Sequence, residues 1–191
     1  MGELEAVNML LKAIGMSPVN SLEESHPDVE TARSTLHRVR KSVQQRGWWF
    51  NIDYNVTYTP DNVGHIDIPS FIYNVVPLEP TYVMRGSKLY DTENNTYVFT
   101  DDVIISTQVK ILEWADMHET LQDYCAYYAA AQYVREELED TAKEDSFKAD
   151  AGIAMLQLRD LDLEAGQYNV FDNARVARAR GGVRPYNLGR N

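Results

Sequence analysis

The side chains that most often do chemistry in proteins are few and scattered in this sequence. Histidine occurs at His26, His37, His65 and His118, without the HxxxH spacing that places two metal ligands on one helix face, and the single cysteine is Cys125. Zinc sites usually combine several such residues at short spacing. We therefore predict no metal site and no cofactor, and we interpret His118 as a surface residue at a helix start.

Cys125 is a candidate nucleophile by residue type alone. It lies among Tyr124, Tyr127 and Tyr128 at helical spacing, and no basic residue nearby in sequence would lower the pKa of its thiol. A small buried side chain is the better interpretation. The sequence also contains neither a GxxxxGK[ST] phosphate loop nor a GxSxG nucleophile elbow.

Carboxylates beside aromatic residues are the remaining chemical candidates. Asp53 is close in sequence to Trp48-Trp49 and Tyr54, and Glu113 and Asp116 flank Trp114. Two carboxylates across a cleft are the minimum for glycoside hydrolysis, so a glycoside hydrolase activity that uses paired carboxylates remains the alternative function. With 29 acidic residues in 191 such neighbours are expected by chance, and we assign no catalytic residue.

The charge is divided unevenly along the chain. The net charge is -11, and residues 111–172 alone carry four basic against fifteen acidic side chains. Residues 173–191 carry five arginines and no acid. An acidic body repels nucleic acid at long range, so a sequence-specific DNA reader is unsupported, and the arginines would favour acidic surfaces. No apolar run is long enough to span a membrane.

Hydrophobic periods predict the elements that must position these residues. Apolar spacings of three and four predict one helix ending at Gly15, a second from an N-cap at Ser25 to Gly47, and a helical region between Asp116 and Gly166. In that region Thr141–Glu144 has the spacing of a capping box, so either a new helix starts there or one long helix runs through.

Between the helices the apolar period changes to two, which predicts β-strands. The predicted strands are 50–58, 66–68, 71–76, 81–85, 88–90, 97–99, 103–106 and 109–112. Arg85–Lys88 has the composition of a hairpin tip.

The sequence thus predicts an α+β fold. It is mainly an α-helical bundle built from N- and C-terminal helical pairs, residues 1–49 and 114–172, with an antiparallel β-meander or small barrel inserted at 50–113. Residues 173–191 form a basic C-terminal arm.

Two groups of charged residues are candidate interaction sites. The candidate docking cations, which would contact partner proteins, are Arg175, Arg178, Arg180, Arg184 and Arg190 of the arm, with Arg85 and Lys88 of the hairpin tip. The candidate channel-lining acids are Glu136, Glu137, Glu139 and Asp140. Such an acidic run is most often a solvated helix face, and its mutual repulsion indicates a function only if many copies surround a channel.

Several segments resemble tail tubular protein A, the head–tail adaptor of short-tailed bacteriophages. The most specific is Gln45-Arg46-Gly47-Trp48-Trp49-Phe50-Asn51, preceded by Ala6-Val7-Asn8, Ile14-Gly15 and Pro18-Val19 and followed by Tyr82–Gly86, Leu89-Tyr90-Asp91 and the passage 111–133. The resemblance covers residues 4–165 and includes no catalytic motif.

The resemblance implies a structural protein of the virion tail, assembled in the bacterial host cytoplasm. It implies a homo-oligomeric ring, twelvefold in the virion, between the portal protein and the nozzle (tail tubular protein B), with tail fibres attached near the junction. Double-stranded DNA would pass through the ring without specific binding, and an acidic lining would keep it from adhering. Contacts between subunits would be heterologous and ring-closing.

Overall fold

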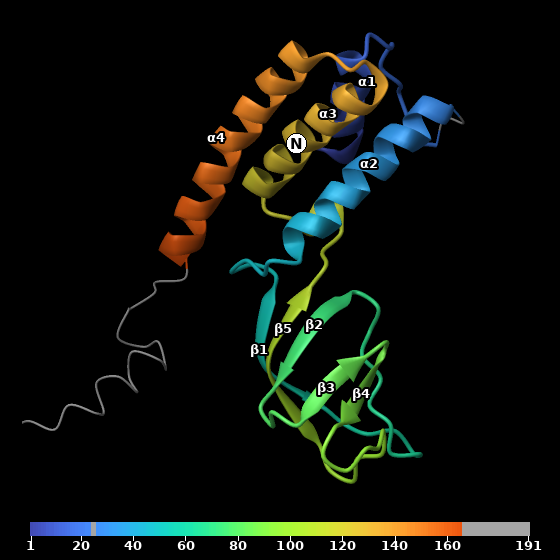
Figure 1. Cartoon of the computed structure of the whole chain (residues 1–191), viewed down its shortest axis with the longest axis vertical. Helices are drawn as coiled ribbons and strands as arrows, with labels where there is room; N and C mark the ends of the chain where they lie inside the picture. The colour runs from blue at the N-terminus through green and yellow to red at the C-terminus, as the bar shows by residue number, and fades with distance from the viewer. Residues whose placement is uncertain (24–25, 166–191) are drawn as a thin grey trace, which may run out of the picture.

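The computed structural model describes residues 1–23 and 26–165. In these residues the chain runs through two helices, five strands, a short 3-10 turn and two more helices (Figure 1). The predicted α+β class is therefore confirmed.

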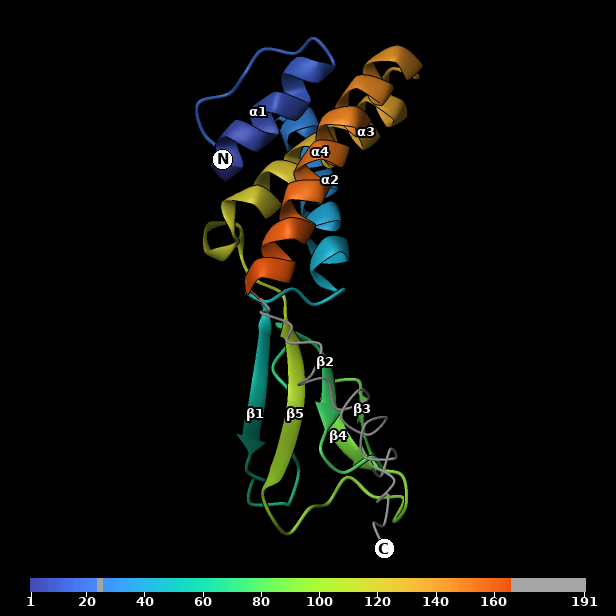
Figure 2. The same cartoon turned by 90° about the vertical axis from the view of Figure 1, so that its left-hand side faces the viewer.

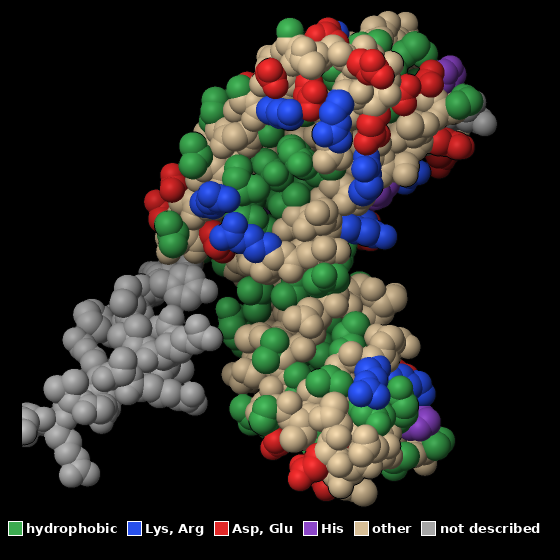
Figure 3. Space-filling model, in the orientation of Figure 1, with side chains coloured by type: hydrophobic (Ala, Val, Ile, Leu, Met, Phe, Trp, Pro, Cys, Tyr) green, Lys and Arg blue, Asp and Glu red, His purple; other side chains and the backbone are tan. Residues whose placement is uncertain are grey.

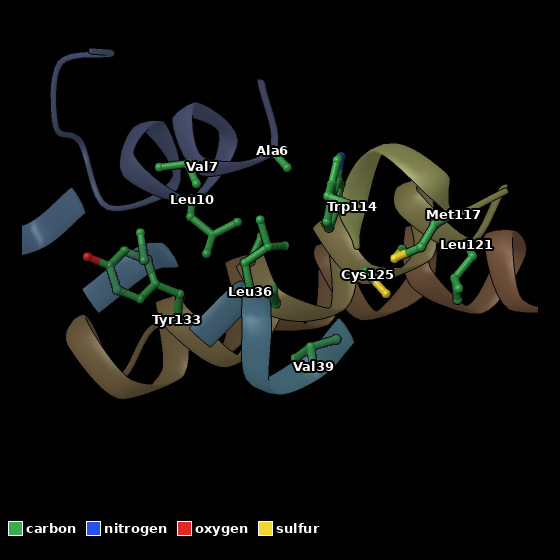
Figure 4. Close-up of a cluster of buried hydrophobic side chains, with 14 of the residues drawn as sticks. Ala6, Val7, Leu10, Leu36, Val39, Trp114, Met117, Leu121, Cys125 and Tyr133 are labelled. Carbon is green, nitrogen blue, oxygen red and sulfur yellow. The ribbon is translucent and has the colours of Figure 1, made fainter. Parts of the chain in front are cut away.

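The helices pack around α3, which contacts each of the other three. Their bounds are α1 Glu3–Ala13, α2 Pro27–Gln44, α3 Glu119–Glu137 and α4 Thr141–Ala165. Figure 4 shows side chains from α1, α2, α3 and the 3-10 turn Trp114–Asp116 converging on one core, among them Leu10, Leu36 and Tyr133. All three are fully buried, and burial of Leu10 and of Leu36 contributes roughly 1.5–3 kcal/mol each relative to an exposed position.

The helix ends follow local signals, with one correction. Gly15 has a φ of +84°, which a residue with a Cβ rarely adopts, and it ends α1 as predicted. Helix α2 begins at Pro27, but its N-cap is His26, whose Nδ1 accepts a hydrogen bond from the Asp28 backbone N–H at 3.3 Å. The predicted N-cap, Ser25, lies outside the described residues.

The strands form one three-stranded sheet and one hairpin, all antiparallel. Their bounds are β1 Ile52–Tyr58, β2 Ile72–Pro77, β3 Tyr82–Arg85, β4 Lys88–Asp91 and β5 Val103–Lys110. The sheet order is β1-β5-β2, and β3 pairs with β4. A second core forms between them, centred on Ile66, Leu89 and Ile105.

Four of the predicted strands differ from the structure. The two strands predicted at 103–106 and 109–112 are one continuous strand, β5. The segments 66–68 and 97–99 are not strands, although Ile66, Ile68 and Phe99 are buried. The segment 66–68 still pairs with β4 through a single antiparallel bridge between Asp67 and Lys88.

The helical part (α1 to α4) and the β part (β1 to β5) lie at opposite ends of an elongated molecule (Figure 2). The chain passes between them after α2 and again after β5. At this junction the buried Gln44 side chain accepts from the Leu112 N–H at 2.7 Å and donates to the Leu112 carbonyl at 3.1 Å. Asn51 donates to the carbonyls of Gln44 and Lys110, so buried hydrogen bonds join the two crossings.

Candidate interaction surfaces

The predicted channel-lining acids lie at the end of α3 and in the turn to α4. Glu136, Glu137, Glu139 and Asp140 are all exposed. Arg38 of α2 donates to Glu136 at 2.9 Å, and Asp140 accepts from the Lys143 backbone N–H at 3.1 Å. Two of the four acids are thus engaged within the chain, and the channel-lining role stays a prediction.

Helix α4 starts at Thr141, so of the two alternatives that the sequence leaves open the structure has a new helix, but the capping residue differs. Asp140 supplies the side-chain cap, whereas the sequence suggests a capping box from Thr141 to Glu144. Glu144 is instead buried and accepts from Lys148 at 2.7 Å, with Arg135 3.9 Å away. Glu144 therefore ties α4 to α3.

The hairpin tip predicted at Arg85–Lys88 is confirmed, since Arg85 pairs with Lys88 and Gly86 has a φ of +62°. Both cations have contacts within the chain. The Arg85 guanidinium lies 3.7 Å from the centre of the Tyr90 ring, and Lys88 Nζ lies 2.9 Å from His65 Nδ1. A docking role for this tip stays a prediction. The five arginines of the arm, Arg175, Arg178, Arg180, Arg184 and Arg190, lie outside the described residues.

The polar residues of α2 do not form one exposed strip. Arg40 and Gln44 are buried at the junction, and Arg40 pairs with Glu113 and donates to the Leu112 carbonyl. Arg33 and His37 both contact the Glu3 carboxylate of α1, each at 3.2 Å. Most of the basic side chains of α2 are therefore paired with other groups of the same chain.

Two of the three carboxylates beside aromatic residues, Asp53 and Glu113, are held in ion pairs. Burial raises the pKa of Asp53, but hydrogen bonds from Lys110 and Gln108 outweigh it and leave the pKa lowered. The hydrogen bond from Arg40 lowers the pKa of Glu113. A glycosidase general acid needs a raised pKa, so neither carboxyl group suits that role.

Cys125 is fully buried, and burial raises the pKa of its thiol, which confirms a packing role. His118 is the N-cap of α3, its Nδ1 accepting from the Thr120 N–H, which confirms its placement at a helix start. Within residues 1–23 and 26–165 no three His, Cys, Asp or Glu side chains gather as a metal site would need. No helix in the same residues has the length and apolar character to cross a membrane.

Helix α4 has a second apolar face, which was not predicted from the sequence. Its buried face, which packs on α3, carries Ala151, Ala154 and Leu158. On the opposite face Ile153, Leu156 and Leu163 are about three-fifths exposed, and we call these three residues the α4 stripe. Figure 3 shows hydrophobic and acidic side chains side by side along the outer edge of α4. A helix with apolar residues on two faces is the signal that was available in the sequence.

A groove lies between α1 and the first turns of α4. Its volume is about 550 Å³, and we call it the α1–α4 groove. It is lined by Met1, Glu5, Met9, Lys12, Ala13, Lys143 and Phe147. Its floor is mainly apolar and its rim is charged, the composition of a surface that receives apolar side chains.

Comparison with known proteins agrees with the resemblance in the sequence. A family described as tail tubular protein matches residues 4–168. Tail tubular protein A of Klebsiella phage KP34 is 33% identical to the chain over 136 residues, which cover 69% of this chain and 71% of that protein. The family match spans all four helices and the whole β part. The chain belongs to the tail tubular protein family and is a structural protein of the phage virion tail.

Proposed function

We propose that the chain forms a ring that joins the portal protein to the nozzle, tail tubular protein B, and provides the channel for genome ejection. The ring is twelvefold in the virion, and tail fibres attach near its junction with the nozzle. The observation that carries this proposal is the family match over both the helical and the β part.

Exposed apolar residues support assembly through both parts. In addition to the α4 stripe, Tyr54, Val76 and Ile104 are exposed on the strands of the three-stranded sheet. Exposed apolar surface beyond scattered single residues usually marks protein–protein contacts. A subunit with such surface at both ends can contact neighbours along the whole length of the molecule.

The charge pattern supports a channel that does not hold DNA. The chain carries 29 acidic against 18 basic residues, and the acids at the α3–α4 turn are exposed. Each lysine or arginine contact to a phosphate releases counterions and adds affinity, which would slow a moving duplex. Glu137 and Glu139 are the best placed of the candidate lining acids, because Glu136 and Asp140 have partners within the chain.

Docking to the rings above and below is the role proposed for the cations. The five arginines between 173 and 191 would order onto an acidic partner surface, in the manner of coupled folding and binding. Arg85 and Lys88 would contact the nozzle or fibre side.

Negative-stain microscopy of the purified chain with its portal protein tests the proposal. We expect closed rings seated on the portal. A variant ending at residue 172 should still form rings but bind the portal less, since it lacks the docking arginines. Failure of the full chain to form rings or to bind the portal would contradict the proposed function.

A further inference from the structure

The α4 stripe is a surface that the single chain leaves uncovered. Ile153, Leu156 and Leu163 lie on the side of α4 that faces away from α3, with exposures of 58%, 61% and 65%. Fully burying a leucine or isoleucine side chain contributes roughly 1.5–3 kcal/mol, so covering three of them is a substantial driving force for association.

Acidic side chains accompany the stripe. Asp160 lies between Leu156 and Leu163 on the same helix face, and Glu164 follows one turn later; both are exposed. Helix α4 as a whole carries six acidic and three basic residues. A surface that covers the stripe should therefore combine an apolar floor with basic residues at its rim.

The α1–α4 groove has this composition. Met9 and Phe147 contribute apolar floor, and the groove volume of about 550 Å³ accommodates several aliphatic side chains. Its charged lining residues are Lys12, Lys143 and Glu5, all exposed, so basic side chains outnumber acidic ones at the rim. Lys143 Nζ donates to the Ala13 carbonyl at 2.7 Å, which fixes this cation beside the groove.

The stripe cannot fill the groove of its own chain. The groove is lined by Lys143 and Phe147 near the start of α4, whereas the stripe runs from Ile153 to Leu163 on the helix face opposite α3. Both surfaces belong to a rigid helical core, so a contact between them joins two molecules. Because the two surfaces differ, that contact is heterologous, and it repeats from copy to copy.

We propose that the α4 stripe of one subunit packs into the α1–α4 groove of a second copy of this chain, with Asp160 and Glu164 facing the lysines at the rim. This contact is the subunit interface of the proposed ring, and in this respect the inference rests on the proposed function. It assigns the subunit contact of the helical part, and the exposed apolar residues of the β part form a separate contact surface.

Cysteine cross-linking tests the pairing directly, because Cys125 is buried and gives no background. The variants are Leu156→Cys in the stripe and Met9→Cys in the groove, mixed in equal amounts and treated with a short bis-maleimide. Side chains held together at an interface react at a high effective concentration. We expect cross-linked dimers at about tenfold the yield of a control mixture of Leu156→Cys with Ser42→Cys on the exposed side of α2.

The double variant, Leu156→Cys with Met9→Cys in one chain, should give a ladder of multimers. Efficient dimers from Leu156→Cys alone would overturn the proposal, since they would show two stripes facing each other. Yields no higher than the Ser42 control would also overturn it. Circular dichroism confirms that each variant is folded before cross-linking.

Ring formation by the unmodified chain is scored separately by microscopy. Rings without the cross-link would overturn this interface and leave the proposed function standing. The cross-link without portal-bound rings would support the interface and contradict the proposed function.

Discussion

His37 of α2 contacts Glu3 of α1 and has both basic and acidic side chains near it. Burial lowers its pKa from the ordinary value of 6.5, Arg40 and Arg33 lower it further, and Glu3 and Glu113 oppose the shift. As the pH falls through 6.5 the unfolded chain therefore takes up a proton before the folded chain does. The free energy of unfolding should decrease over this range.

Replacing His37 with glutamine removes this proton uptake while keeping a donor for Glu3. We expect thermal melts of His37→Gln to show a flatter dependence of Tm on pH than the wild type between about pH 7.5 and about pH 5.5. Subtracting the two curves cancels the other titrating groups. A steeper curve for the variant would mean that the folded chain stabilises charged His37.

Cys125 offers a probe of unfolding. The thiol is inaccessible, and burial raises its pKa, so the native chain should resist alkylation. We expect iodoacetamide to label Cys125 only as denaturant unfolds the helical core, with labelling and circular dichroism giving the same midpoint. Labelling of the native chain at the rate of a free thiol would contradict the packing.

The role of a single residue could be predicted from the sequence only where its contacts are with residues close to it in the chain. Cys125 and His118 could be placed because their roles follow from neighbours within one helix turn. Arg40 could not, because its partner Glu113 is 73 residues away and only the fold brings them together. The stripe residues were overlooked because the same helix offers a second, buried set of apolar residues.

At the scale of elements, the junction between the helical and β parts rests on a few buried amides. Replacing Gln44 with leucine leaves the Leu112 N–H without its acceptor, although Arg40 still donates to the Leu112 carbonyl. An unsatisfied buried group costs about 1–3 kcal/mol, and we expect that loss for Gln44→Leu in urea unfolding.

The neighbouring residue provides a matched control for this prediction. Gln45 is exposed, so Gln45→Leu should change the free energy of unfolding by no more than about 0.5 kcal/mol. Equal effects of the two substitutions would show that the loss comes from the helix end rather than from the buried amide.

Helices were predictable from the apolar period, but the strands only in part. The sequence predicts two strands in place of β5, because Gln108 interrupts the apolar residues of this segment. In the structure Gln108 is buried, accepts from Tyr58 and donates to Asp53. A buried polar residue with cross-strand partners has no signature in sequence, since its partners are 50 and 55 positions away.

At the scale of the whole molecule, charge separates the acidic body from the arginines beyond residue 172. If the arm alone contacts phosphate, the logarithm of DNA affinity should fall with the logarithm of salt with a slope no steeper than about -4.5. The chain ending at residue 172 should show no binding in the same fluorescence anisotropy titration. Retained binding would place phosphate contacts on the body and argue against a repelling channel.

The surfaces that the packed helices leave exposed were the hardest feature to predict from the sequence. The helical pairs, the β segment and the charge division follow from the sequence, and the family match agrees over residues 4–168. Which face of α4 stays uncovered, and that a groove adjoins α1, follow only from how the four helices pack. The division into domains and the role of the arm stay predictions.

One hydrogen bond ties the end of α4 to the junction between the helical part and the β part. Trp49, just after α2, donates its backbone N–H to Asp162 at 3.0 Å, close to the last residue of the helix. The last turn of α4 is therefore fixed beside the segment that leads from α2 into β1. A neighbouring subunit that displaces this end of α4 would also displace the junction between the helical part and the β part.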